Sequence, residues 1–88
     1  GRPEEAIEQY RFVLSRGPHS IAQFNLALCH LASGAYARAG TAYEAAFGRH
    51  GVAEAERLGV PGHLALLISR GPHAAAAREI QRRYWPED

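Results

Sequence analysis

The chain has 88 residues, of which 47% are hydrophobic and 22% are charged, so it is long enough for one small domain and too short for two. Ten basic and nine acidic residues leave a formal net charge of +1, which argues against a general polyanion-binding protein. The sequence contains no apolar run of about 18 residues that would span a membrane, and its single cysteine excludes an internal disulfide framework.

The first predicted helix covers residues 3–16. Pro3 suits the first turn because its missing N–H would have no partner there, and the two glutamates that follow place negative charge at the positive end of the helix dipole. Apolar residues then recur at helical spacing. Gly17 and Pro18 end the helix, since glycine favours the C-terminal cap and proline cannot continue the helix.

The second and third helices are predicted from the same periodicity. The second begins at Ser20, with Gln23 three residues on in the pattern of a capping box, and it stops at Ser33 and Gly34. The third covers residues 36–47. No stretch alternates apolar and polar residues as a strand would, so the sequence predicts an all-α fold.

Glycine and proline divide the rest of the chain into shorter pieces. His50 and Gly51 break the helical pattern after the third predicted helix, and residues 52–58 predict a short helix that ends at a breaker cluster, residues 59–62. Residues 63–69 are strongly apolar and predict another helix. The last predicted helix covers residues 73–85.

An internal repeat is visible when the chain is shifted by 33 residues, which places Ala6 on Ala39 and Tyr10 on Tyr43. A small residue lets a paired helix approach closely, and an aromatic residue one turn later fills the groove beside it. The two copies therefore read as equivalent helices of successive helical hairpins, the signature of a repeat protein.

Residues 1–50 resemble the tetratricopeptide repeat family. The residues that carry the resemblance in the central copy are Phe24, Asn25, Leu26, Ala27, His30, Gly34, Tyr36, Ala39, Tyr43, Ala46 and Phe47. The chain departs from the family's motif at Ala27, where Gly is common, at His30, where Tyr is common, and at Gly51, where Pro is expected. Residues 62–71 are similar to the second helix of an ankyrin repeat, but the segment that normally precedes it is absent; an unrelated helical bundle is the other alternative.

The resemblance implies one domain over residues 1–88, built as a right-handed solenoid of antiparallel hairpins with about two and a half repeats. Residues 1–17 would be the second-helix half of a truncated repeat, and residues 20–50 a complete repeat. Residues 52–85 would be a degenerate repeat with an insertion, in which residues 59–70 supply the first helix.

The sequence shows no catalytic constellation and predicts no cofactor or metal. No pair of the five histidines has the i, i+4 spacing of a helical metal site. Cys29 and His30 point about 100° apart on a helix, so the imidazole is poorly placed to activate the thiol. Arg82 and Trp85 belong to a basic and aromatic C-terminal end, where nucleic-acid binding would need several phosphate contacts arranged along a surface. Glu79, four residues before Arg83, instead favours an i, i+4 surface pair.

We therefore expect a non-catalytic protein–protein interaction module with a groove for a peptide segment of a partner. The predicted groove residues share one face of the second helix: Ile21, Phe24, Asn25, Leu28 and Leu31. The resemblance implies that Asn25 bonds a bound peptide, although the family's basic clamp for a terminal carboxylate has no match near His63. The alternative is a structural or oligomerisation segment of a larger multi-repeat scaffold or multidomain enzyme.

The first helix also predicts self-association. The side that a preceding first helix would cover carries apolar residues, which favour a two-fold homodimer or a helix-exchanged pair; they are Ile7, Phe12 and Leu14. The alternative is that residues 52–58 or Trp85 fold back over this side.

Overall fold

The computed structural model describes residues 3–14 and 19–86 of the chain. This part is helical and contains no strand. Its helices are α1 (Pro3–Leu14), α2 (Ser20–Ala32), α3 (Tyr36–Arg57), α4 (Val60–Arg70) and α5 (Ala74–Tyr84). The all-α class predicted from periodicity is confirmed. The turn predicted at Gly17 and Pro18, and the side chains of Tyr10, Val13 and Leu14, lie outside the described residues.

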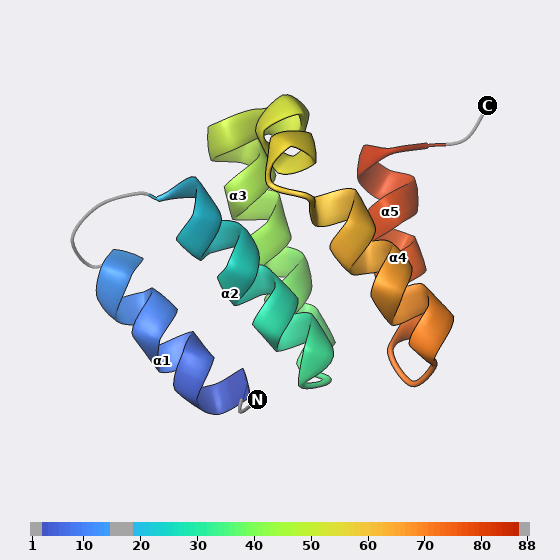
Figure 1. Ribbon diagram of the computed structural model, residues 1–88, viewed down its shortest axis with the longest axis horizontal. Helices are drawn as coiled ribbons and strands as arrows, with labels where there is room; N and C mark the ends of the chain where they lie inside the picture. Colours follow the sequence, from blue (N-terminus) through green and yellow to red (C-terminus); the bar gives the residue numbers. More distant parts are fainter. Residues whose placement is uncertain (1–2, 15–18, 87–88) are drawn as a thin grey trace.

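The helices lie side by side in chain order and run alternately in opposite directions (Figure 1). The most extensive packing joins α2 to α3, followed by α1 to α2 and α4 to α5. Each of these pairs is consecutive in the chain, so neighbours in sequence are neighbours in space. Smaller contacts of α4 with α2 and α3, and of α5 with α3, join the last pair to the rest.

Helix α3 differs from the prediction, which ended it at Phe47. Helical backbone continues through Gly48 to His50, and a second helical stretch, residues 52–57, follows a break at Gly51, where φ is 85° and ψ is 167°. The predicted break and the short helix predicted at residues 52–58 are therefore confirmed. Ala55, beyond the break, is fully buried, so tertiary packing holds the stretch that follows the break, and Gly48 is helical despite the low helix propensity of glycine. The break redirects the last turns of α3 and only glycine adopts its backbone conformation readily.

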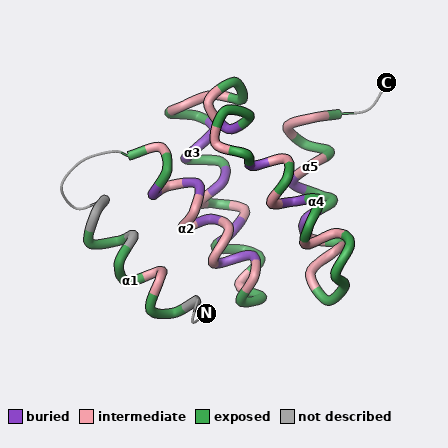
Figure 2. The backbone as a smooth tube through the Cα atoms, in the orientation of Figure 1, coloured by how far each residue is buried: buried purple, intermediate pink, exposed green. Residues whose placement is uncertain are grey.

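The buried residues that form the core belong to α2, α3, α4 and α5, which carry the purple segments in Figure 2. The largest fully buried side chains of the core are Tyr43, Leu31, Leu64 and Val60. Phe47 lies at the meeting point of three helices: its ring packs edge-on against Phe24 at a centroid distance of 5.1 Å and stacks on Tyr84 at 3.7 Å. Such aromatic pairs add to the free energy of burying their area, so Phe47 couples the central hairpin to α5.

The predicted capping box at the start of α2 is wrong. Ser20 is the first helical residue, and the N-cap is His19, whose side chain makes no capping hydrogen bond. The Ser20 hydroxyl instead donates to Glu54 Oε2 at 2.7 Å. The break at Gly51 places that carboxylate within reach of the hydroxyl. A hydrogen bond to a charged carboxylate is stronger than the neutral hydrogen bond that a capping hydroxyl accepts from a backbone N–H.

Candidate functional site

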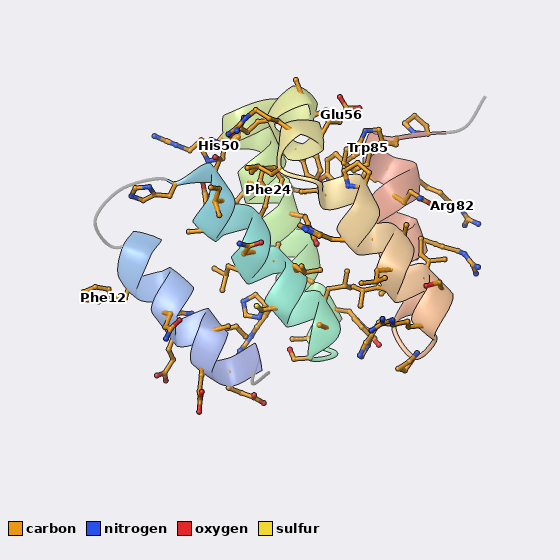
Figure 3. All side chains as sticks on the ribbon, in the orientation of Figure 1. Phe12, Phe24, His50, Glu56, Arg82 and Trp85 are labelled. Atoms are coloured by element: carbon orange, nitrogen blue, oxygen red, sulfur yellow. The ribbon has the colours of Figure 1, made fainter. Side chains whose placement is uncertain are left out.

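A pocket of about 260 Å³ lies where α2, α4 and the end of α3 meet. Its lining residues come from three separate segments: Ile21, Phe24, Asn25, Leu58, Val60 and His63. Figure 3 shows Phe24 between α2 and the upper part of α3. Helices α2 and α4 are separated in sequence by the whole of α3, so the pocket exists only because the chain folds back.

Helical spacing accounts for which side chains reach the pocket. Ile21, Phe24 and Asn25 are related by i, i+3 and i+4, so they lie on one face of α2. Val60 and His63 are spaced by three residues at the start of α4. That start follows Gly59, whose φ of 83° makes the turn that leads out of α3.

The pocket has an apolar base and a polar rim. Phe24 and Val60 are 3% and 1% exposed, whereas Ile21 is 57% exposed. Asn25 and His63 are both half-buried. An apolar side chain of a ligand can therefore occupy the base, while an amide and an imidazole at the rim offer donors and acceptors to a polar backbone.

The structure brings together three of the five residues that the sequence predicted for the groove. Ile21, Phe24 and Asn25 line the pocket, but Leu28 and Leu31 do not. Leu31 is 1% exposed and belongs to the core. The periodicity could not distinguish these positions, because α2 packs against α1, α3 and α4 and is apolar on more than one side.

Leu58, Val60 and His63 are the lining residues that sequence reasoning missed. Their contribution depends on the path of the chain through Gly51 and Gly59, which periodicity does not predict. The sequence feature that could have identified them is the pair of apolar residues on either side of Gly59. By itself, this glycine predicts only the start of a breaker cluster.

Polar contacts hold the end of α3 against α2 beside the pocket. Besides the Ser20 contact, Glu54 accepts two hydrogen bonds from Arg57, each at 2.7 Å. The hydrogen bonds from Arg57 and Ser20 lower the pKa of Glu54 to about 2. His50 and Gln23 are also hydrogen-bonded. These contacts fix the segment that supplies Leu58 to the pocket.

Two of the side chains considered as candidates for chemistry are partly buried or hydrogen-bonded to another side chain. Burial raises the pKa of the Cys29 thiol, which lowers the fraction of reactive thiolate. Arg83 donates to Glu44 at 2.7 Å. Among the described residues, no group of three His, Cys, Asp or Glu is placed to hold a metal ion. No helix in residues 3–14 and 19–86 is long and apolar enough to cross a membrane.

The residues predicted for self-association are only partly on the surface. Phe12 is 63% exposed, Ile7 is half-buried, and the side chain of Leu14 lies outside the described part. Trp85 does not fold back over α1: it packs against Phe47 and donates to Glu56 at 3.1 Å, on the opposite side of the molecule from Phe12 (Figure 3).

Stacked antiparallel helices, with a pocket between two helices of successive hairpins, define an all-α helical-repeat protein. The sequence profile described as tetratricopeptide repeat matches residues 1–56, and the chain belongs to this family. It is therefore a protein-interaction module in the general sense of that family. No curated protein and no solved structure matches the chain.

Proposed function

We propose that the chain is a non-catalytic module that binds a short segment of a partner protein in the pocket between α2 and α4. The observation that carries the proposal is the pocket itself, whose base is apolar and whose rim carries Asn25 and His63. A volume of about 260 Å³ suits one or two ligand side chains rather than a large cofactor.

Binding would combine one apolar anchor with hydrogen bonds to the peptide backbone. Ile21 supplies exposed apolar area at the rim, and burying such area is the main source of affinity at an interaction hot spot. The Asn25 amide can donate to a peptide carbonyl and accept from a peptide N–H. Leu28, half-buried one turn further along α2, extends this surface, whereas Leu31 supports it from the core.

The test uses peptides selected from a displayed random library on the unmodified chain. Ile21 and Leu66 are both large exposed apolar residues, 57% and 52% exposed, but only Ile21 lines the pocket. We expect Ile21→Ser to weaken binding of the selected peptides by about tenfold or more, since burying such a side chain contributes about 1.5–3 kcal/mol. Leu66→Ser is the matched control and should bind as the unmodified chain does.

A second pair of measurements separates binding from folding. Asn25→Ala should also weaken binding, by the loss of a hydrogen bond to the peptide, with unchanged far-UV circular dichroism. Equal loss in Ile21→Ser and Leu66→Ser, or no loss in either, would contradict the proposal. The chain would then have a structural role in a larger assembly.

A further inference from the structure

A second groove lies on another part of the molecule, between α1 and α3. Helix α1 packs against α2 rather than α3, which leaves a space of about 540 Å³ between them. We call this space the basic groove. Its lining residues are Arg11 of α1, His30 of α2, and Ala37, Arg38, Thr41, Ala42 and Ala45 of α3.

The charged groups of the basic groove have no ion-pair partner within the described part of the chain, while the Thr41 hydroxyl donates to the Ala37 carbonyl at 3.2 Å. Arg11 and Arg38 form no ion pair with any described carboxylate, and no acidic residue is among the described residues that line the groove. His30 is only 5% exposed, yet its ring makes no hydrogen bond to a described residue. Its ring nitrogens are reached from the groove, since the Tyr43 hydroxyl is the only enclosed side-chain polar atom without a partner among the described residues. Arg11 and Arg38 supply positive charge that is not ion-paired within the described residues, so the groove is suited to an anionic ligand.

Burial and the two nearby arginines also lower the pKa of His30. The ring is therefore held in the neutral form, in which one nitrogen donates and the other accepts. Arg11 and Arg38 supply the positive charge of the groove. The rest of its described wall is made of small side chains, which let the backbone of a docking helix approach closely.

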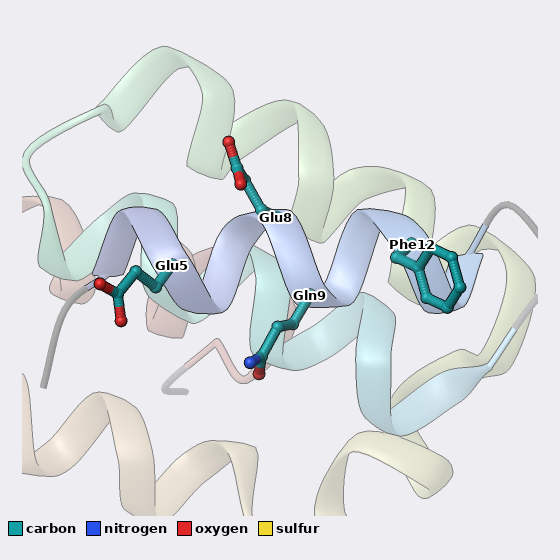
Figure 4. Close-up of a pocket in the computed structure, with 4 residues that line it drawn as sticks. All are labelled: Glu5, Glu8, Gln9 and Phe12. Carbon is teal, nitrogen blue, oxygen red and sulfur yellow. The ribbon is translucent and has the colours of Figure 1, made fainter.

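The outer face of α1 has the opposite character. Glu5, Glu8, Gln9 and Phe12 line a shallow hollow of about 670 Å³ along this helix (Figure 4). Their spacing of i, i+3, i+4 and i+7 places them on one helical face, which we call the acidic face. No basic residue is among the described residues that line it, and Phe12, 63% exposed, adds an aromatic ring to two carboxylates.

We propose that the acidic face of α1 in one copy of the chain docks into the basic groove of a second copy. Glu5 and Glu8 meet Arg11 and Arg38 of the other copy, and Phe12 covers its alanine-lined wall. The charges are complementary, and the helical spacing of the acidic face is that of a helix lying in a groove. His30 of the receiving copy gains the hydrogen-bond partner that it lacks within the described chain.

The arrangement is head to tail, because the acidic face and the basic groove are different surfaces. Such a heterologous contact does not close on itself in a pair, so it leaves one of each surface free for a further copy. A two-fold dimer through α1, the arrangement expected from the sequence, would bring the acidic faces together and juxtapose like charges. The charges on α1 therefore favour the heterologous contact.

The experiment separates the two surfaces by changing their charges. The variant Arg11→Glu/Arg38→Glu loses the basic groove, and Glu5→Gln/Glu8→Gln loses the acidic face without creating a basic one. By sedimentation equilibrium up to about 1 mM, a concentration that detects weak contacts, the unmodified chain should show a mass that rises beyond a dimer. Each variant alone should associate at least about tenfold more weakly, because the contact between its own two surfaces has lost its charge complementarity.

Mixing the two variants provides the decisive result. Each retains the surface that the other has lost, so the equimolar mixture should form a dimer that grows no further. Adding Ala45→Trp to Glu5→Gln/Glu8→Gln fills the groove without changing its charge and should abolish the mixed dimer. Arg78→Glu/Arg82→Glu, a matched reversal on the exposed side of α5, should associate as the unmodified chain does. Circular dichroism confirms that each variant is folded.

Three outcomes would overturn the proposal. The unmodified chain could stay monomeric, which would leave the groove to another partner. Arg11→Glu/Arg38→Glu could associate as strongly as the unmodified chain, which would point to two-fold pairing through α1. The mixed dimer could survive Ala45→Trp, which would show that only overall charge attracts the two variants.

Discussion

Tyr43 carries the buried hydroxyl that is least satisfied in the described structure, and removing it should stabilise the protein. The side chain is 1% exposed, and its hydroxyl oxygen has no hydrogen-bond partner among the described residues. Burial, with a smaller contribution from the nearby Cys29, raises the pKa of Tyr43 well above its usual range, so the hydroxyl stays protonated. A buried donor without a partner costs about 1–3 kcal/mol.

Tyr43→Phe removes the hydroxyl and keeps the ring in place against Phe47, whose centroid lies 6.2 Å away. Part of the gain is offset by the small space left by the missing oxygen. We therefore expect the free energy of unfolding to rise by about 1 kcal/mol, and the melting temperature by about 4–8 °C for a domain of this size. Thermal and urea denaturation, followed by circular dichroism, measure both quantities.

Tyr36→Phe is the control, because the Tyr36 hydroxyl has partners. It is hydrogen-bonded to His73 Nδ1 at 2.7 Å and donates to the carbonyl of Pro72 at 3.4 Å. Its removal should lower the free energy of unfolding by up to about 1 kcal/mol, since these contacts are exposed. A Tyr43→Phe variant that is less stable than the unmodified chain would refute the reasoning and show that its hydroxyl is satisfied.

Two further predictions concern the end of α3. Gly51→Ala should lower the free energy of unfolding by about 1–3 kcal/mol, because a side chain is strained at φ 85° and ψ 167°. Gly48 lies in the helical part, where an added Cβ meets nothing within 4 Å. Gly48→Ala should therefore raise the free energy of unfolding by up to about 1 kcal/mol. Equal effects in urea denaturation would contradict this difference. The lowered pKa of Glu54, about 2, stabilises the fold above the usual carboxyl pKa, and this contribution is lost as the pH falls from about 5 to 2. Glu54→Gln should melt at a lower temperature than the unmodified chain at pH 7, and the difference should shrink over that pH range; a constant difference would argue against the Glu54 contacts.

The sequence predicted those parts of the fold that depend on local signals. Helices α4 and α5 lie within a few residues of their predicted positions, because Gly59 and Gly71 punctuate the chain and apolar residues recur between them. The family was predicted because residues such as Ala39 and Tyr43 have small or aromatic side chains where helices must pack closely. These positions are both buried.

The parts that the sequence did not predict depend on long-range contacts. The periodicity ends the third helix at Phe47, yet the helix continues through Gly48 to His50, because Phe47 is buried in the core and His50 is hydrogen-bonded to Gln23 of α2. Ser20 reads as a cap, yet its hydroxyl bonds Glu54, 34 residues away. In each case a tertiary contact outweighs a local preference of about 1 kcal/mol or less.

The same reasoning explains why only part of the candidate pocket could be predicted. Ile21 and Asn25 lie on a helical face that periodicity identifies, but the opposite wall is built by Leu58 and Val60, which the backbone at Gly51 and Gly59 carries across from α3 to α4. A straight continuation of α3 beyond Gly51 would direct this wall elsewhere and leave α2 as an open helical face. The proposed peptide site therefore depends on the path of the chain at two glycines as much as on the residues that would contact the ligand.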